Sequence, residues 1–488
     1  MKSCKRLMSA ITAAVMSAVT FCACGSFTAS ARLEQADASP SKSITNGNPL
    51  ISNVFCADPT AVEYEGRLYV YGTNGSQQLE AVGKDGENTY EHIKSLVVLS
   101  TDDMANWTYH GTIDVESISP WIIASWAPSI VSRVEDDGET HFYMYYSNSG
   151  WGVGVLTATS PLGPWTDPLG TSIVDGNTKG FNGCQTPFDP GVVIDDDGVG
   201  WLSFGGGTDS ARIVRLGEDM ISLDSEIVLI PSPYHFEASE LNYINGTYVY
   251  TYNNSWDSRI EWDEDAERSP KCSMAYLTTT TPLDSDSWEY RDWYFKSPGE
   301  YGLEYSNNHT HLQKYNGKYY LFYHSLFPQA ALGISGGFRS LCVNEIEVDE
   351  ENVVISQGTA TKEGVEQIKS LDVFEVNQAE TMRTFLEICY NSTDTAGNMT
   401  VSAESDGGWI YVSGADFGDG AKTFHASAKG SGYIEIYLDD LNGRCAASVK
   451  VDSKNFAEVQ TKLSKIKGEH DIYFVLSEGV EFDEWIFE

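Results

Sequence analysis

Hydrophobic and polar positions follow one pattern at five places before residue 324. At each place a small cluster with a polar residue and a small residue or proline opens a short apolar run. A turn glycine and an aromatic-rich run come next, as in Asp58, Gly66 and residues 68–71. Two short apolar runs around a glycine turn predict a β-hairpin. The five units open at Asp58, Trp126, Asp189, Glu237 and Asn308.

The spacing of these units predicts how the hairpins assemble. Consecutive units begin 48 to 71 residues apart, which leaves room for two further strands after each hairpin. Four-stranded sheets repeated radially form a β-propeller, so we expect a five-bladed β-propeller over residues 49–365. A β-sandwich of ordinary hairpins is the alternative, but it does not explain the functional-looking cluster that opens each unit. In a propeller, the innermost strands all run toward one mouth of the channel, so these clusters would converge there.

The pattern changes near residue 372. Short apolar runs at residues 408–412, 433–437 and 470–476 are separated by turns rich in glycine and aspartate. Such short strands with frequent turns predict a small, jelly-roll-like β-sandwich over residues 372–488. The chain is therefore expected to be all-β with two folded domains, in keeping with its 488 residues.

The N-terminal residues have the pattern of an export signal, since a basic start precedes an apolar stretch over residues 7–22. This stretch is short for a membrane span. We expect a signal peptide over residues 1–31, cleaved at a small-residue site, and a linker over residues 32–48. A lipid anchor at Cys24 is the alternative. Both routes predict an extracellular protein, either released or held at the outer cell surface.

Composition and charge narrow the class of partner. The chain has 31 Lys and Arg against 70 Asp and Glu, a net charge of −39, which disfavours nucleic acids and anionic membranes. A neutral polymer would not be repelled, and 27 Tyr and 12 Trp supply flat faces that stack on sugar rings. The sequence contains no nucleophile elbow, zinc-protease or Walker A motif. No organic cofactor and no protein partner is implied, and a monomer is expected.

Three carboxylates open the first, third and fourth units: Asp58, Asp189 and Glu237. Glycosidic hydrolysis needs one carboxylic acid to protonate the leaving oxygen and a second carboxylate to activate water or attack carbon. A third carboxylate can raise the pKa of the acid by like-charge repulsion. The proline after each aspartate predicts an extended backbone that fixes the direction of its side chain. Glu240 is a rival to Glu237, although in a strand it would face the opposite side.

At these residues the chain resembles glycoside hydrolase family 43, over about residues 50 to 345. The resemblance implies a five-bladed propeller and inversion of anomeric configuration. It implies that Asp58 is the general base, Asp189 the third carboxylate that tunes and holds the acid, and Glu237 the general acid. The motifs that carry it are Ala57-Asp58-Pro59, Ser125-Trp126-Ala127-Pro128, residues 159–165, Phe188-Asp189-Pro190, Phe236-Glu237-Ala238, Asn308-His309 and residues 320–324.

Three further residues are candidates for the site. His309 is similar to the family's axial histidine, which would contact substrate and help to hold a Ca²⁺ ion in the channel; a hydrogen-bonded core histidine is the alternative. Arg339 resembles a late arginine that reaches the substrate, against a surface arginine. Trp126 would be a platform for stacking on sugar, against a core tryptophan. The acidic run at residues 195–198 lacks EF-hand spacing and is interpreted as a turn.

The C-terminal stretch resembles a family 6 carbohydrate-binding module, from Ala379-Glu380 to residues 482–485. Glu481 stands where an asparagine usually contacts sugar, and Phe456 stands near an expected tryptophan. These departures leave the fold prediction intact and put sugar binding by the usual cleft in doubt.

The functional hypothesis is an α-L-arabinofuranosidase that removes arabinose side chains from arabinoxylan. A β-D-xylosidase acting on xylan or xylo-oligosaccharides is the alternative, because the two sugars present similar hydroxyl groups to the same carboxylates. An endo-arabinanase is a weaker third hypothesis. A carbohydrate-binding protein without catalysis is the alternative from another class, and the presence of all three carboxylates counts against it.

Overall fold

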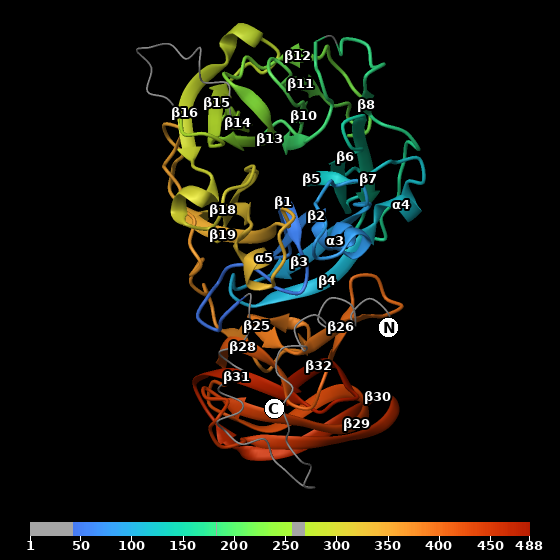
Figure 1. Ribbon diagram of the computed structural model, residues 1–488, viewed down its shortest axis with the longest axis vertical. Coiled ribbons are helices and arrows are strands. Elements are labelled where there is room, and N and C mark those ends of the chain that lie inside the picture. Colours follow the sequence, from blue (N-terminus) through green and yellow to red (C-terminus); the bar gives the residue numbers. More distant parts are fainter. Residues whose placement is uncertain (1–41, 182, 256–268) are drawn as a thin grey trace. The chain divides into compact units, whose positions relative to one another are not determined.

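The computed structural model describes residues 42–181, 183–255 and 269–488 (Figure 1). The expected signal peptide over residues 1–31 and the alternative anchor at Cys24 lie outside the described residues and stay predictions. Within the described part, no helix is both long and apolar enough to cross a membrane. The described residues divide into two compact units, one within residues 53–98 and 112–364, and the other of residues 42–52, 99–111 and 365–488.

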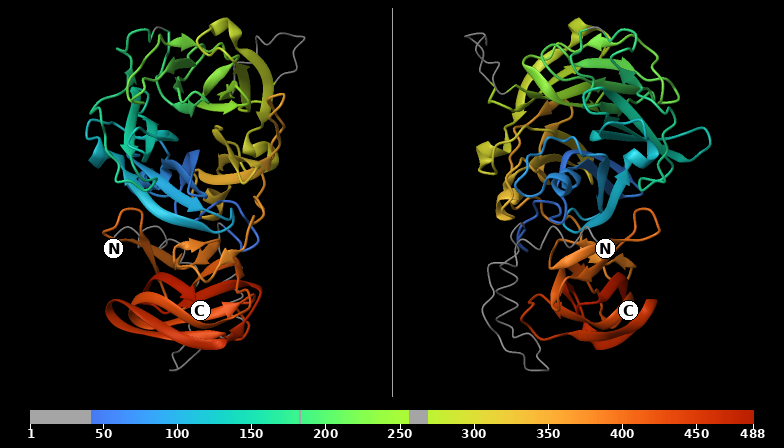
Figure 2. Two further views of the ribbon diagram at one scale, coloured as in Figure 1. Left: turned by 180° about the vertical axis from the view of Figure 1, so that it is seen from behind. Right: turned by 45° about the vertical axis from the view of Figure 1, so that its right-hand side comes forward.

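The strands from β1 to β19 form a five-bladed β-propeller, and the blades follow one another in sequence order around a ring (Figure 2). Blade one contains β1 (Cys56–Tyr64), β2 (Arg67–Asn74), β3 (Ser95–Thr101) and β4 (Trp107–Asp114). Blade two contains β5 (Trp126–Val134), β6 (Thr140–Ser147), β7 (Gly152–Ala158) and β8 (Val174–Asp175). Blade three contains β9 (Gly191–Ile194), β10 (Gly200–Phe204), β11 (Arg212–Arg215) and β12 (Val228–Leu229).

Blade four contains β13 (His235–Ile244), β14 (Thr247–Asn254), β15 (Met274–Thr279) and β16 (Glu289–Phe295). Blade five contains β17 (Thr310–Tyr315), β18 (Lys318–Ser325) and β19 (Ser340–Ile346). A two-stranded hairpin follows, formed by β20 (Val348–Asp349) and β21 (Val354–Ile355). The helical segments are α3 (Gly75–Val82), α4 (Val115–Ile118), η2 (Ser285–Ser287), η3 (Pro298–Tyr301) and α5 (Phe327–Ala331).

The five predicted hairpins are confirmed as the first two strands of the five blades. Their turn glycines all adopt a left-handed conformation, with φ between 76° and 83°, which a residue with a Cβ atom rarely adopts. These glycines are Gly66, Gly138, Gly198, Gly246 and Gly317. The expectation of four strands per unit holds for blades one to four, whereas the sheet of blade five has three described strands.

The aromatic-rich strands pack against the neighbouring blades on both sides. In β6, Phe142, Met144 and Tyr146 join the buried cluster shared with blade one, whereas Tyr143 and Tyr145 join the cluster shared with blade three. Because side chains alternate across a strand, a blade buried on both faces needs apolar residues at consecutive positions. This double burial explains the unbroken aromatic runs in the sequence.

The innermost strands β1, β5, β9, β13 and β17 lie next to one another in that order, and the ring closes between β17 and β1. Short hydroxyl side chains link neighbouring blades at this ring. The N–H of Ile130 donates to Thr60 Oγ1 at 3.2 Å, and the N–H of Val192 donates to Ser129 Oγ at 3.0 Å. These bonds satisfy donors on the inner edges of the sheets. The closed ring of inner strands places the opening residues of all five units around one axis.

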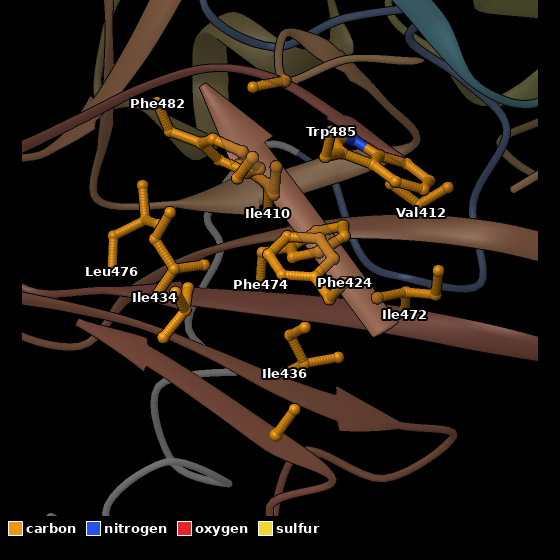
Figure 3. Close-up of a cluster of buried hydrophobic side chains, with 14 of the residues drawn as sticks. Ile410, Val412, Phe424, Ile434, Ile436, Ile472, Phe474, Leu476, Phe482 and Trp485 are labelled. Carbon is orange, nitrogen blue, oxygen red and sulfur yellow. The ribbon is translucent and has the colours of Figure 1, made fainter. Parts of the chain in front are cut away.

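The C-terminal unit is a curled β-sheet whose apolar side forms its core (Figure 3). Its central strands run in the order β28, β31, β29, β32, β27, and the core includes Ile410, Phe424, Phe474, Phe482 and Trp485. The strands of this sheet are β22 (Leu371–Asp372), β23 (Asn377–Gln378), β25 (Thr384–Leu386), β26 (Ile388–Ser392), β27 (Met399–Ala403), β28 (Gly408–Asp416), β29 (Ala421–Leu438), β30 (Ala447–Ile466), β31 (Glu469–Leu476) and β32 (Val480–Phe487). The short strand β24 (Thr381–Met382) pairs instead with β4.

Candidate active site

The strands that carry the acidic residues are irregular at those residues. The pairing of β1 with β2 shifts between Ala57 and Thr60, on either side of Asp58. The pairing of β13 with β14 shifts on both sides of Glu237. Asp189 lies just before β9. Bulges of this kind bend a strand and re-aim its side chains, and they are frequent beside active sites.

The extended backbone expected for the two Asp-Pro aspartates is wrong. Asp58 and Asp189 have φ values of 52° and 49°, in the left-handed region. Hydrogen bonds hold these conformations, because the N–H of Asp58 donates to His324 Nδ1 at 3.3 Å and the N–H of Asp189 donates to Ser147 Oγ at 2.7 Å. Such a conformation costs on the order of 1–3 kcal/mol and persists where the surroundings over-determine it, typically at functional sites.

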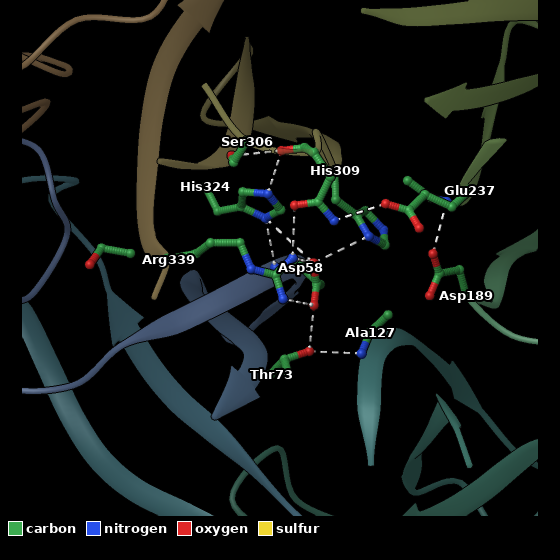
Figure 4. A network of polar contacts seen from close by, with 12 residues as sticks. Asp58, Thr73, Ala127, Asp189, Glu237, Ser306, His309, His324 and Arg339 are labelled. Carbon is green, nitrogen blue, oxygen red and sulfur yellow. Dashed lines mark hydrogen bonds and ion pairs between the residues drawn. The ribbon is translucent and has the colours of Figure 1, made fainter. Parts of the chain in front are cut away.

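Asp58 is a buried carboxylate with several donors around it (Figure 4). Arg339 Nη1 donates to Oδ1 at 2.9 Å, and Thr73 Oγ1 donates to Oδ2 at 2.7 Å. His309 Nδ1 lies 3.6 Å from Oδ1. Burial alone would raise the pKa of Asp58, but the Arg339 guanidinium and the neighbouring histidines hold it well below its usual range. Asp58 is therefore ionised at any pH near neutrality.

Asp189 and Glu237 are two further carboxyl groups of the site. Asp189 lies just before β9 of blade three, and Glu237 lies on β13 of blade four. Burial raises the pKa of Asp189 to about 6, and the charge of Asp58 adds to this rise. Burial raises the pKa of Glu237 to about 7, and the charge of Asp189 adds to it. The N–H of Ala238 donates to Asp189 Oδ2 at 2.8 Å, so the residue after Glu237 is held directly by Asp189.

Two histidines flank Asp58, and their pKa values are displaced in opposite directions. Burial lowers the pKa of His309, but the Asp58 carboxylate outweighs this effect and leaves the pKa raised. Burial and the Arg339 charge lower the pKa of His324 to about 4, so this ring is neutral. Its Nδ1 accepts from the N–H of Asp58, and its Nε2 lies 2.9 Å from the carbonyl oxygen of Asn307. The hydrogen bonds therefore assign the proton to Nε2.

Arg339 and Trp126 meet through Tyr90. The Arg339 guanidinium lies 5.1 Å from the centre of the Tyr90 ring, and the Tyr90 and Trp126 rings are edge to face at 6.0 Å. Trp126 Nε1 donates to the carbonyl oxygen of Tyr90 at 3.0 Å. Arg339 is buried, so the surface alternative for it is wrong. Trp126 is partly buried at the start of β5, and its stacking on sugar stays a prediction.

Glu240 belongs to a separate contact. It is buried and lies 2.6 Å from His311 Nδ1, whereas Glu237 accepts from Asn307 Nδ2 at 2.8 Å. A shift in strand register separates the two glutamates, so simple strand alternation does not describe them. His309 and His311 likewise face different carboxylates, Asp58 and Glu240.

The sequence analysis did not identify Thr73, Tyr90, Asn307 or His324 as site residues. Thr73 Oγ1 donates to Asp58 and accepts from the N–H of Ala127 at 2.8 Å, which joins blades one and two. Only the position of His324 after the aromatic run of blade five pointed toward the site. The other three are ordinary residues in a strand or loop, and their contacts arise across blades.

His309 is the residue at which the family resemblance places a Ca²⁺ ion. Calcium takes six to eight oxygen ligands in proteins. Among residues 42–181, 183–255 and 269–488, no group of three or more His, Cys, Asp or Glu side chains is arranged to hold a metal ion. The Nδ1 atom of His309 is directed toward Asp58. The ion stays a prediction, and no chemical step below uses it. The acidic run at residues 195–198 is the turn between β9 and β10, as expected.

The site thus contains carboxyl groups around one axis whose pKa values are shifted in opposite directions. Asp58 is ionised, and the pKa of Glu237 is raised, so Glu237 keeps its proton up to about pH 7. An ionised carboxylate and a protonated carboxyl group are the two groups that glycosidic hydrolysis requires.

Comparison with known proteins identifies the family. Residues 46–354 match the family described as "Glycosyl hydrolases family 43". The chain belongs to this family. Residues 378–488 match "Carbohydrate binding module (family 6)". As a family 43 member the protein is a glycoside hydrolase, and it carries a carbohydrate-binding module at its C-terminal end.

Two relatives with a named activity align with most of this chain. An "Arabinoxylan arabinofuranohydrolase" of Bacillus subtilis is 34% identical over 91% of this chain and 93% of its own length. A protein of the same name from Paenibacillus polymyxa is 32% identical over 91% of this chain and 74% of its own length. A crystal structure of the family 43 arabinoxylan arabinofuranohydrolase from Bacillus subtilis, in complex with cellotetraose, superposes with a TM-score of 0.86 at 33% identity. It covers 92% of this chain and 98% of that one.

The two unusual residues of the module lie together. Lys429 Nζ is 3.0 Å from Glu481 Oε2 and 4.4 Å from the centre of the Phe456 ring. Thr400 Oγ1 donates to Glu481 Oε1 at 2.7 Å. The carboxylate and the aromatic face are thus already in contact with protein groups. This arrangement agrees with the doubt about sugar binding by the usual cleft.

Replacing Arg339 tests its pairing with Asp58. Arg339→Met removes the cation that lowers the pKa of Asp58, so we expect that pKa to rise and the acid limb of the pH–activity profile to move to higher pH. Breaking a buried ion pair on one side costs about 3–5 kcal/mol of unfolding free energy. Denaturant unfolding and pH–activity profiles measure both effects.

Arg215→Met is the matched control. Arg215 pairs with Asp224 at 2.9 Å on the surface, where its side chain is 41% exposed. An exposed pair contributes about 0–1 kcal/mol, so this variant is expected to keep the wild-type profile. Equal losses of stability in the two variants would contradict the structural role of Arg339.

Proposed function

We propose that this protein is an inverting α-L-arabinofuranosidase that removes arabinose side chains from arabinoxylan. Asp58 is the general base, Glu237 the general acid, and Asp189 the carboxylate that tunes the acid. The observation that carries this proposal is the opposite displacement of the pKa values of Asp58 and Glu237 within one site. Two titratable groups with separated pKa values are the mark of an acid and base pair.

The reaction follows from these protonation states. The Asp58 carboxylate takes a proton from a water molecule while the water oxygen bonds to the anomeric carbon. The bond from that carbon to the leaving oxygen breaks, and the Glu237 carboxyl group gives its proton to this oxygen. Arg339 and Thr73 hold both oxygens of Asp58, so the base cannot rotate away from the water. Asp189 disfavours ionisation of Glu237 and orients it through the N–H of Ala238.

The choice of sugar rests on the relatives. The two proteins that are 34% and 32% identical over most of the chain are both named arabinoxylan arabinofuranohydrolases. More distant relatives are named for both sugars, such as the "Xylosidase/arabinosidase" of Bacteroides ovatus, 24% identical over 63% of this chain. The extent of the first match favours arabinose.

The test is sugar release from arabinoxylan, followed by chromatography and by proton NMR of the first product formed. Arabinose is expected as the main product, and the anomer first observed should be the inverted one. Xylose or xylo-oligosaccharides as the main product would instead support the β-xylosidase alternative. Retention of the anomeric configuration would contradict the assignment of Asp58 as a base.

A further inference from the structure

Asn307 contacts the groups around both candidate catalytic carboxyls. It lies in the loop before β17, and its side-chain Nδ2 donates to Glu237 Oε1 at 2.8 Å. Its Oδ1 accepts from Arg339 Nη1 at 3.4 Å. Its backbone carbonyl oxygen accepts from His324 Nε2 at 2.9 Å. Arg339 donates to the side chain of Asp58, and His324 accepts from its backbone N–H.

The orientation of the Asn307 amide follows from its partners. A guanidinium only donates, so the amide oxygen must face Arg339 and the NH₂ group must face Glu237. Glu237 Oε1 therefore acts as an acceptor. The proton of the neutral Glu237 carboxyl group then resides on Oε2, the oxygen that Asn307 leaves free.

We propose that Asn307 is a positioning residue of the glycosidase reaction: its amide selects the oxygen of Glu237 that carries the acid proton, and its two oxygens hold the groups that fix Asp58. This inference rests on the proposed function. Asn307 links Glu237 on blade four with the groups around Asp58 on blade one. These bonds keep the acid and the base in fixed positions relative to each other.

The charges around Glu237 define what a change at Asn307 should do. Asp189 before β9 and Asp58 on β1 raise the pKa of Glu237, whereas Arg339 before β19 lowers it. The hydrogen bond from Asn307 also lowers it, because the bond favours the ionised form. Loss of this bond therefore raises the pKa of Glu237. Activity that needs protonated Glu237 then persists to higher pH, and the basic limb of the profile moves upward.

The experiment compares wild type with Asn307→Asp and Asn307→Ser on p-nitrophenyl α-L-arabinofuranoside and on arabinoxylan. Asn307→Asp keeps the shape of the side chain but faces Glu237 with oxygen, and Asn307→Ser is small and polar in a partly buried loop. In both variants we expect kcat/KM to fall by up to about a hundredfold, since the acid is misplaced. In Asn307→Ser the basic limb should move up by about one pH unit, as expected for one lost hydrogen bond to a charged group. In Asn307→Asp it should move further, because the new negative charge also disfavours ionisation of Glu237.

The control is Asn308→Ala, in the next residue. Asn308 is buried and its Nδ2 donates to the backbone carbonyl oxygens of Lys296 and Cys272. Its loss is expected to lower the melting temperature without moving the basic limb. Unmoved basic limbs in both Asn307 variants, with an active wild type, would overturn this inference alone. A wild type inactive on both substrates would instead overturn the proposed function.

Discussion

Asp58→Asn is expected to lower kcat for arabinose release from arabinoxylan by about 10²–10⁴-fold, the usual contribution of a general base. The amide has the same shape, and its oxygen can still accept from one of the donors that hold the carboxylate, Arg339 or Thr73. It cannot accept a proton from water, because it has no basic oxygen. The Asp58 carboxylate is ionised near neutral pH, since its pKa lies well below the usual range. Chromatography of the released sugar measures the loss.

Asp196→Asn is the matched control for this prediction. Asp196 is exposed in the turn between β9 and β10, and its replacement removes the same charge outside the group of buried site carboxylates. Its activity is expected to equal that of wild type. If Asp58→Asn retains activity within a few-fold of this control, Asp58 is not the base.

Glu237→Gln is expected to lower kcat on arabinoxylan by a similar factor, about 10²–10⁴-fold. The sugar oxygen that leaves the polymer needs a proton, and glutamine has none to give. An aryl arabinofuranoside with a 2,4-dinitrophenyl leaving group needs no protonation, so its hydrolysis should fall far less. Parallel kinetics on the two substrates separate the general acid from a residue that only supports the fold.

The pH–activity profile is a second test of Glu237 as the general acid. Activity requires protonated Glu237, so the wild-type rate on arabinoxylan should fall as the pH rises through about 7. This basic limb should be absent from the residual activity of Glu237→Gln. Glu240→Gln is the informative comparison, because Glu240 was the rival acid and contacts His311. A dependence on the leaving group in Glu240→Gln, and none in Glu237→Gln, would reverse the assignment.

The propeller was predictable from the chain because its repeat is local. In the sequence, each hairpin is indicated by an apolar run, a turn glycine and an aromatic run. The turn glycine of the first hairpin, Gly66, has a φ of 78°. The double burial of β6 explains why these runs do not alternate with polar residues. The three-stranded sheet of blade five was not predictable, because residue spacing shows only that further strands have room to form.

The acidic residues of the candidate site were predictable from the sequence, but the residues that hold them in place were not. Asp58, Asp189 and Glu237 stand at repeated positions, and the repeat itself pointed to their convergence. Thr73 and Asn307 carry no such mark. The rule for residues before proline failed at Asp58, because a hydrogen bond from its backbone N–H to His324, 266 positions away, outweighs a local steric preference.

The sequence by itself determined the β-hairpins, the number of blades and the identity of the acidic residues, because burial and turn formation depend on neighbours a few positions apart. The tertiary structure decided the chemistry of those residues. Asp58 and Arg339 are 281 positions apart and pair at 2.9 Å, while Asp189 and Glu237 approach from adjacent blades. A pKa depends on burial and on the distance to other charges, and both exist only once the ring of blades has closed.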